Sequence, residues 1–255
     1  MTKTINLLIS GVSGAMGLKV LELSQNDSSF QPCAGLCNDP TSHNLPLPLY
    51  SDINQVVEDV DIIIDFSSPK ILDSLLDYGL KESLGLVLAT TGYDEDDLKQ
   101  IEKASQSIPI LQANNMSLGV TMMDNVIEQL ARALKDYDLE IIEKHHNKKK
   151  DAPSGTAFSL FDALNKGRDG QLSQVQGRSG FSEGRTPNEV GLSAVRAGTI
   201  PGDHQVIFAG EDEVIEINHR AYSKAIFAKG ALQAAQFIRN QNKGLFNMKD
   251  VLSHD

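Results

Sequence analysis

The stretch Gly11-Val12-Ser13-Gly14-Ala15-Met16-Gly17 decides the fold, because it directly follows a short apolar strand, Ile5–Ile9, and opens a helix. Glycines at this place let the backbone turn tightly and approach a pyrophosphate, and a helix N-terminus supplies free N–H donors. The spacing is G-x-x-G-x-x-G rather than the commoner G-x-G-x-x-G, so a turn that simply contains glycine is the alternative. The position after the first strand favours a dinucleotide-binding loop.

Outward from this loop, the first half of the chain alternates between apolar strands and helices with an apolar stripe. Strand-sized apolar runs recur at residues 60–65, 86–88 and 108–111, and helical spacing of apolar residues follows at 72–80 and 95–105. Alternation at this spacing predicts a parallel sheet with helices on both faces. The expected class is therefore α/β, with a Rossmann-like parallel sheet.

The second half has a different pattern, and the change occurs near residue 117. Residues 139–145 alternate between charged and apolar side chains, and 206–210 and 214–217 are two strands joined by a short turn. Such a hairpin indicates an antiparallel or mixed sheet, so we predict a second α+β domain with a mixed sheet. The polar, glycine-rich stretch 165–189 predicts a long loop, which is either functional or mobile.

Composition narrows the class of protein. The 255 residues include 23 Lys plus Arg against 34 Asp plus Glu, a net charge of −11, which argues against a nucleic-acid-binding protein. The chain has no apolar run near the ~20 residues that a membrane helix needs, and its first residues lack the pattern of a signal peptide. We therefore expect a cytoplasmic protein that does not bind membranes. Cys33 and Cys37, four apart on a predicted strand, lie ~13 Å apart, too far for a disulfide.

Polar residues follow three of the predicted strands, where ligands bind in parallel sheets. The second strand ends in Cys37-Asn38-Asp39, and Asp39 can accept hydrogen bonds from two ribose hydroxyls, which favours NAD over NADP. The other two strand ends read Ala89-Thr90-Thr91-Gly92 and Ala113-Asn114-Asn115-Met116. Helix capping is the alternative role for Thr90 and Thr91.

The densest chemical signal lies between Glu143 and Thr156, where four lysines and two histidines fall within seven residues. A run of charged residues like this one is usually a solvent-exposed loop. Here the run leads into Pro153-Ser154-Gly155-Thr156, which predicts a helix start whose N–H groups and hydroxyls form an anion site. Neighbouring lysines add positive charges for carboxylates, so we predict a small dicarboxylate substrate.

His145 and His146 are expected to have different roles, because neighbouring residues of a strand face opposite sides. One imidazole is then available to the reacting centre while the other holds the substrate. A zinc site is the alternative. Neighbouring histidines on a strand make a poor chelate, and the sequence offers no evident third ligand, so we expect no metal.

The run from His145 to Thr156 matches the signature of the dihydrodipicolinate reductase family almost residue for residue. The chain resembles that family over nearly its whole length, including the glycine loop, Ala89–Gly92, Asn115–Ser117 and Gly198–Ile200. The His-His to Ser-Gly-Thr string is specific to the family, whereas the glycine loop alone is not.

The resemblance implies a two-domain reductase. Residues 1–116 and 241–255 would form the dinucleotide-binding domain, and residues 117–240 a domain that binds substrate and builds a homotetramer. The family reduces 4-hydroxy-tetrahydrodipicolinate with NADH or NADPH to tetrahydrodipicolinate and water, on the way to diaminopimelate and lysine.

The resemblance also implies roles for individual residues. His145 matches the proton donor/acceptor and Lys149 the proton donor. The substrate-binding positions are His146, Ser154, Gly155 and Thr156. The cofactor-binding positions are Gly11, Val12, Ser13, Gly14, Ala15, Met16, Ala89, Thr90, Thr91, Ala113, Asn114, Asn115 and Met116. Ala15 stands where some members have a basic residue, and Asn38 occupies the acidic ribose-reading position, with Asp39 one residue later, so the choice between NADH and NADPH stays open.

Two other functions compete with this one. A non-catalytic NAD(P)-binding sensor needs no proton donors, so His145 and Lys149 argue against it. Another NAD(P)-dependent dehydrogenase of a small dicarboxylate, such as a semialdehyde dehydrogenase, needs a cysteine nucleophile, and Cys33 and Cys37 lie on a strand of the nucleotide domain. The sequence assigns no role to Arg196, His219, Arg220 and Lys224.

Overall fold

The computed structural model describes residues 4–181 and 184–253. The chain divides into two compact units, with the boundaries after Leu118 and before Lys224. The second unit is thus inserted between two parts of the first. Within the described residues, we find no helix that is both long and apolar enough to cross a membrane.

The first unit is built on a seven-stranded, fully parallel sheet. Its strands are β1 (Ile5–Ser10), β2 (Phe30–Leu36), β3 (Leu49–Tyr50), β4 (Ile62–Asp65), β5 (Gly85–Leu88), β6 (Pro109–Gln112) and β12 (Gly244–Phe246). Their order is β12-β6-β5-β4-β1-β2-β3. The strand order reverses at β1, and dinucleotides bind at such a switch point.

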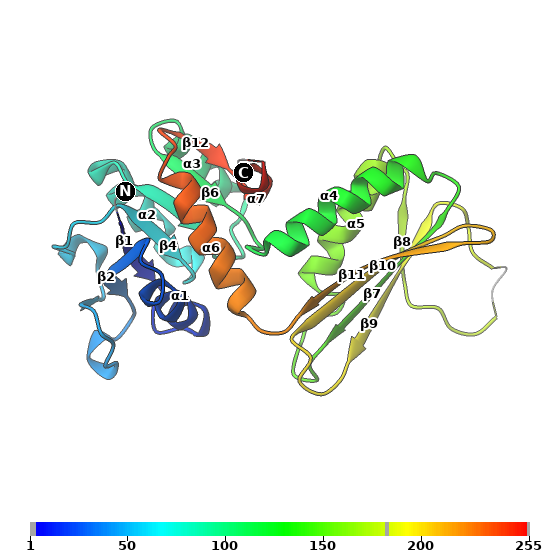
Figure 1. Ribbon diagram of the computed structural model, residues 1–255, viewed down its shortest axis with the longest axis horizontal. Coiled ribbons are helices and arrows are strands. Elements are labelled where there is room, and N and C mark those ends of the chain that lie inside the picture. The colour runs from blue at the N-terminus through cyan, green and yellow to red at the C-terminus, as the bar shows by residue number, and fades with distance from the viewer. Residues whose placement is uncertain (1–3, 182–183, 254–255) are drawn as a thin grey trace. The chain divides into compact units, whose positions relative to one another are not determined.

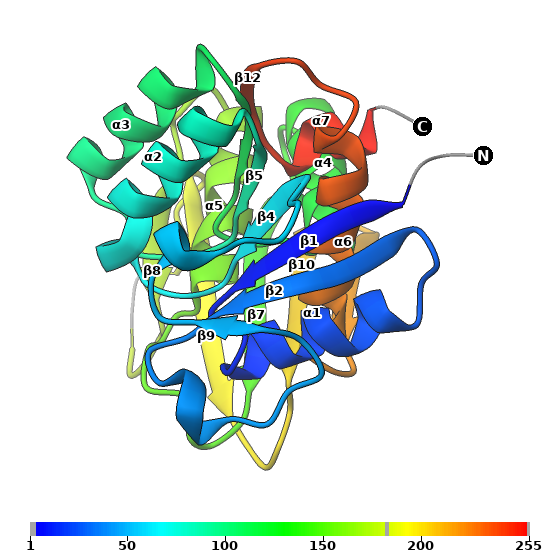
Figure 2. The same cartoon turned by 90° about the vertical axis from the view of Figure 1, so that its left-hand side faces the viewer.

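Helices cover both faces of this sheet, as Figure 2 shows. Helices α2 (Leu72–Glu82) and α3 (Glu95–Ser105) pack on one face. Helices α1 (Ala15–Gln25) and α6 (Ala225–Ile238) pack on the other, with the short α7 (Met248–Leu252) beside them. Strand residues alternate between the two cores: Leu7 and Ile9 face α1 and α6, whereas Leu8 faces α2. The predicted parallel α/β sheet is therefore confirmed.

The second unit is a five-stranded mixed sheet with two helices on one face (Figure 1). Its strands are β7 (Asp138–His145), β8 (Ser173–Gln176), β9 (Glu189–Arg196), β10 (Gly202–Ala209) and β11 (Val214–Ala221), in the order β11-β10-β7-β9-β8. Helices α4 (Leu118–Ala133) and α5 (Gly155–Gly167) pack on the sheet through a core that includes Ile127, Ile141, Leu160 and Phe208. The predicted hairpin is the antiparallel β10–β11 pair.

Two features differ from the sequence-based expectation. Helix α6 packs against β4, β5 and β6 of the first unit, so the chain re-enters that unit at Lys224 rather than at residue 241. Buried apolar residues in a helix do not show which core the helix joins. The stretch 165–189 is shorter as a loop than predicted, because α5 runs to Gly167 and β8 forms within it; residues 182–183 lie outside the described residues.

Candidate active site

At the glycine loop between β1 and α1, backbone segments lie so close together that a side chain would not fit between them. Gly11 has φ +73°, and a Cβ there would lie 2.5 Å from the Phe66 carbonyl oxygen. A Cβ on Gly17 would lie 2.6 Å from the Val12 Cα and would also clash with the Gly11 carbonyl. Helix α1 begins after Gly14, which has no side chain to cap the first-turn N–H groups. These donors can therefore serve an anionic ligand.

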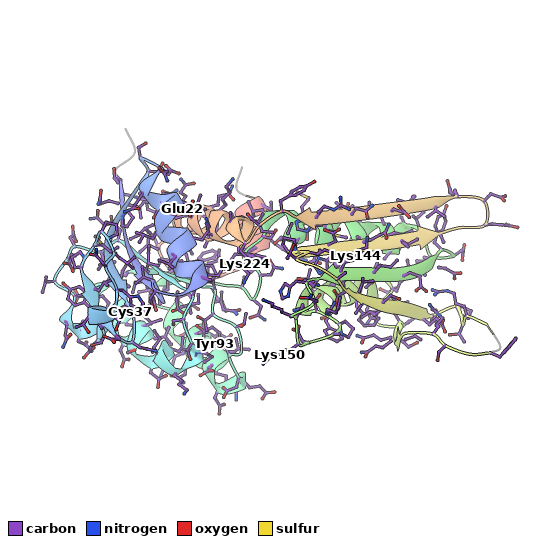
Figure 3. The ribbon with its side chains drawn as sticks, turned by 90° about the horizontal axis from the view of Figure 1, so that it is seen from below. Glu22, Cys37, Tyr93, Lys144, Lys150 and Lys224 are labelled. Carbon is purple, nitrogen blue, oxygen red and sulfur yellow. The ribbon has the colours of Figure 1, made fainter. Side chains whose placement is uncertain are left out.

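A cavity of about 360 Å³ lies at the carboxyl ends of β1, β2 and β4. It is lined by Ser10, Gly11, Ser13, Gly14, Leu36, Cys37, Asn38, Ser51, Asp52, Ile53, Phe66, Ser67, Ser68, Ile71 and Ser74. Cys37 lies just after β2 and is labelled in Figure 3. The cavity thus joins the glycine loop to the end of the second strand, where a ribose and an adenine are expected.

A second cavity, of about 280 Å³, also belongs to the first unit and shares Phe66 and Ser67 with the first cavity. Its lining residues are Met16, Phe66, Ser67, Ala89, Thr90, Thr91, Asn114, Asn115, Met116 and Phe227. Most of them are predicted cofactor positions. Phe66, Ser67 and Phe227 are additions that the sequence reasoning missed, although Phe66 and Ser67 follow a predicted strand as the other lining residues do.

A buried carboxylate organises the strand ends around the second cavity. Asp65, at the end of β4, has no exposed surface and accepts hydrogen bonds from Ser67 Oγ at 2.5 Å and Thr90 Oγ1 at 2.6 Å. Thr90 Oγ1 in turn accepts from the Ser67 N–H at 2.8 Å. The Thr90 hydroxyl is therefore committed to holding two strand ends together, which leaves only the other atoms of this residue for a ligand.

Several predicted cofactor residues lie away from both cavities. Asp39 is exposed and caps a 3-10 turn, Pro40–Ser42, accepting from the Thr41 N–H and from the Thr41 and Ser42 hydroxyls, which lower its pKa. Val12 is buried in the core, and its N–H donates to the Leu36 carbonyl. Ala15 and Ala113 line neither cavity.

The Gly17→Ala substitution should expose the tight packing of this loop. Alanine favours helix by ~1 kcal/mol over glycine, yet here its Cβ collides with backbone, so we expect the free energy of unfolding to fall by ~1–3 kcal/mol. We also expect NADH binding to weaken at least about 10-fold, which is ~1.4 kcal/mol. Urea unfolding and fluorescence titration with NADH measure both.

Leu18→Ala is the matched control for this substitution, because Leu18 lies on the same helix and is 42% exposed. This variant should change NADH affinity by less than about twofold. If Gly17→Ala binds NADH as tightly as the unaltered protein, the glycine loop does not approach the ligand.

In the second unit, Glu143 and His145 lie on the helix-covered face of β7, together with Leu139 and Ile141. Glu143 is 1% exposed, and its carboxylate accepts from Nδ1 of His145 at 2.5 Å. Two guanidinium nitrogens of Arg196 donate to the same carboxylate at 2.8 and 2.7 Å. Burial raises the pKa of Glu143, but the hydrogen bonds from Arg196 and His145 outweigh burial and lower it. The carboxylate is therefore ionised.

The lysine-rich loop follows directly after β7. Lys149 donates to both carboxylate oxygens of Asp151, at 2.9 and 2.8 Å, and this ion pair lowers the pKa of Asp151. The Lys149 side chain is 20% exposed. Lys148 and Lys150 are exposed, and Lys150 is labelled in Figure 3. Lys149 is thus the lysine of this loop that a specific contact orients.

Helix α5 begins at Gly155, as the sequence predicts, with Ser154 as its N-cap. The Ser154 hydroxyl is buried, accepts from the Ala157 N–H at 3.2 Å and lies 3.2 Å from Nε2 of His204. Its own N–H donates to Glu143. Ser154 is therefore turned toward the protein, and the exposed Gly155 and the half-buried Thr156 are the first-turn residues that can face a substrate.

Two further histidines adjoin this cluster on neighbouring strands. His204 of β10 stands opposite Glu143 and packs edge-on against the His145 ring, with 5.1 Å between ring centroids. Burial, followed by the nearby His145 charge, lowers the pKa of His204 to about 4, so His204 is neutral near pH 7. His219 of β11 stands opposite His204, and burial lowers its pKa too. Nδ1 of His146 is buried without a hydrogen-bond partner.

Other arginines of the second unit also have structural partners. Arg178 and Arg185, from the predicted long loop, both bind the Glu140 carboxylate, and Arg178 also binds Glu189. Arg168 donates to the carbonyl oxygens of Leu134, Lys135 and Tyr137. Arg220 pairs with Asp203 at 3.0 Å. Within the part of the chain that the structure describes, we find no group of three His, Cys, Asp or Glu side chains placed to hold a metal ion.

Comparison with protein families and curated proteins matches both units. Residues 5–116 match the model described as "Dihydrodipicolinate reductase, N-terminus", and residues 119–252 match "Dihydrodipicolinate reductase, C-terminus". A relative from Caldanaerobacter subterraneus subsp. tengcongensis, named 4-hydroxy-tetrahydrodipicolinate reductase, is 44% identical over 97% of this chain and 98% of its own length. A relative of the same name from Clostridium tetani is 41% identical over 98% of this chain and 97% of its own length.

Among solved structures, the dipicolinate-bound dihydrodipicolinate reductase from Paenisporosarcina sp. TG-14 is similar in fold. It aligns with a TM-score of 0.83 and 20% sequence identity, covering 97% of this chain and 99% of its own. At this identity the likeness concerns the fold alone: a parallel sheet in one unit and a mixed sheet in the other.

Proposed function

The chain belongs to the dihydrodipicolinate reductase family, and from this premise we propose that it reduces 4-hydroxy-tetrahydrodipicolinate with NADH or NADPH to tetrahydrodipicolinate and water. The observation that carries the proposal is the cluster at the end of β7. There His145 is hydrogen-bonded to the ionised Glu143, and Lys149 is oriented by Asp151. A sensor that only binds nucleotide has no use for two oriented proton-exchanging groups.

The first unit fits a nicotinamide dinucleotide. Gly11 and Gly17 keep the loop free of side chains where backbone segments meet, and first-turn N–H groups of α1 can bind the pyrophosphate. The two adjoining cavities provide space for the two ends of the molecule. When bound, this cofactor supplies a hydride to the substrate.

The second unit then has to supply a proton. Over the reaction one hydride and one proton are added and one water leaves. The hydride electrons move toward the ring nitrogen, and the resulting enamine must be protonated at a neighbouring carbon. An imidazole suits proton exchange near neutral pH, and an ammonium both donates a proton and stabilises negative charge. We assign these roles to His145 and Lys149, and carboxylate binding to His146, Gly155 and Thr156, where the α5 N-terminus adds N–H donors.

Of the two coenzymes, we propose NADH as the preferred one. None of the described residues that line the larger cavity is Lys or Arg, and Asp52 is among them. A 2′-phosphate there would lack a cationic partner and face a carboxylate. Asn38 lines this cavity and Asp39 does not, so the support comes from the cavity lining rather than from the predicted Asp39 contact.

We also propose that the chain assembles as a homotetramer through its second unit. Alternate residues of this sheet point away from α4 and α5, and several are apolar, namely Ile142, Val195, Ile207 and Val214. Val195 and Val214 are 42% and 58% exposed in the single chain. Apolar residues gathered on one open sheet face are typical of an interface.

Absorbance at 340 nm tests the function directly. NADH should be oxidised when the purified protein meets the fresh condensation product of aspartate semialdehyde and pyruvate, and kcat/KM with NADH should exceed that with NADPH by at least about 10-fold, ~1.4 kcal/mol. Binding of NADH without turnover would indicate a sensor. Turnover with the semialdehyde alone would indicate a different dehydrogenase.

A further inference from the structure

The Glu143 carboxylate is saturated by donors from three different elements. Oε1 accepts from the Ser154 N–H at 3.0 Å and from Nη2 of Arg196 at 2.7 Å. Oε2 accepts from Nη1 of Arg196 at 2.8 Å and from Nδ1 of His145 at 2.5 Å. An ionised carboxylate can only accept hydrogen bonds. Nδ1 of His145 must therefore carry a proton, and the lone pair of the neutral ring is on Nε2.

Nε2 is consequently the nitrogen with which His145 takes up or releases a proton. The neighbouring strand β10 leaves room beside Nε2 of His145. Gly202 of β10 has no side chain, and a Cβ there would come within 3.2 Å of Nε2. His204, also on β10, is neutral near pH 7 because its pKa is lowered to about 4.

Arg196 connects this histidine to the lysine loop. It is the last residue of β9 and stands opposite His145 in the parallel β7–β9 register. Arg196 donates hydrogen bonds to Glu143 from two nitrogens, and its Nη2 also donates to the Asp151 carbonyl oxygen at 2.7 Å. Asp151 holds Lys149 through its carboxylate. One guanidinium is thus fixed both to the group that orients His145 and to the residue that orients Lys149.

We propose that Arg196 and Glu143 form a positioning pair for the proton-transfer step. Glu143 fixes the Nδ1–H tautomer of His145. Arg196 holds Glu143 at a fixed distance from the Asp151 backbone, so the Arg196 side chain positions both proton-exchanging groups, His145 and Lys149. Neither residue needs to touch the substrate. The inference rests on the proposed function and goes beyond it by naming the two residues through which His145 and Lys149 act together.

Glu143→Gln is the decisive variant, because the amide keeps the shape of the side chain. An amide oxygen at the Oε1 position keeps the bonds from the Ser154 N–H and from Nη2 of Arg196. The NH2 group then takes the Oε2 position, where it loses the bond from Nη1 of Arg196, meets Nδ1 of His145 and moves the ring proton to Nε2. We expect kcat/KM to fall about 100- to 10,000-fold, with KM changed less than about threefold. The ring itself contacts the ionised Glu143 on β7 and the neutral His204 on β10. Arg196 on β9 contacts Glu143, and the Lys149–Asp151 pair of the loop is linked to this group through the Asp151 carbonyl oxygen. Because the ring proton then lies on Nε2, we also expect the pH profile of kcat/KM to differ from that of the unaltered protein.

Glu140→Gln is the matched control, since Glu140 lies on the same strand and is also gripped by an arginine, Arg178. It should leave the pH profile of kcat/KM unchanged. Arg196→Lys keeps the charge but loses the two-pronged contact, so we expect about 10- to 100-fold loss, less than additive with Glu143→Gln.

A readout that does not depend on activity is the ¹⁵N NMR signal of the His145 ring. We expect the Nδ1–H tautomer in the unaltered protein and the Nε2–H tautomer in Glu143→Gln. An Nε2–H tautomer in the unaltered protein, or a Glu143→Gln variant with unchanged turnover and pH profile, would overturn the positioning role. An unaltered protein that does not turn over at all, yet shows the Nδ1–H tautomer, would count against the proposed function instead.

Discussion

Lys149→Ala should lower kcat about 100- to 10,000-fold, the range that general-acid groups contribute. Lys149 is the lysine of its loop that is held in place, by both oxygens of Asp151. Its side chain remains 20% exposed, so the ammonium can still reach a bound molecule. Steady-state oxidation of NADH at saturating substrate measures the loss.

Lys150→Ala is the matched control, because this neighbouring lysine lies in the same loop and is exposed (labelled in Figure 3). It should lose less than about threefold in kcat. Lys149→Arg separates charge from proton donation, since a guanidinium stays protonated near neutral pH. KM should then stay within a few-fold of the original while kcat remains as low as in Lys149→Ala. Full turnover in Lys149→Ala would remove Lys149 from the mechanism.

The sequence predicts those parts of the fold that depend on local periodicity. The apolar runs of the first half predict strands of a parallel sheet, and the observed β4 and β5 confirm them. The helix predicted at 95–105 is found there, with Asp94 as its cap. The start of α5 after Ser154 follows from the same kind of local signal.

Features that depend on tertiary partners could not be predicted in this way. The stripe on α6 says only that one side is buried, and its packing against the first sheet depends on the inserted unit ending at Ser223. Strand β12 has three residues and gains its order by pairing with β6. Both are set by contacts between residues far apart in the sequence.

The candidate site also contains features that the sequence could predict and features that it could not. Glu143 could have been found, because it shares the strand parity of Leu139 and Ile141, and a carboxylate on the core face needs partners. The hydrogen bond between Glu143 and Arg196 could not have been predicted, since the two residues are separated by 53 positions. Asp39 shows the opposite case: the residue type suits a ribose, but the backbone of the next residues turns its carboxylate toward Thr41 and Ser42.

His145→Asn should lower kcat about 100- to 10,000-fold while NADH binds with nearly unchanged affinity. The asparagine amide nitrogen can take the place of Nδ1 and donate to Glu143, so the buried carboxylate keeps its fourth hydrogen bond. What the variant lacks is Nε2, the atom that exchanges the proton. Turnover at 340 nm and fluorescence titration with NADH measure the two quantities separately.

A purely structural role for His145 would give a different result, in which the free energy of unfolding falls and kcat does not. If the ring served only to fill space against His204, then Asn would lower the free energy of unfolding by ~1–3 kcal/mol through the lost packing and leave kcat of the folded fraction intact. Urea unfolding of the variant decides between these results. His43→Ala, at an exposed histidine of the first unit, controls for the removal of an imidazole as such and should change neither kcat nor stability. Because the first unit forms the nucleotide cavities without His145, retained NADH affinity together with lost kcat would assign the defect to proton transfer in the second unit.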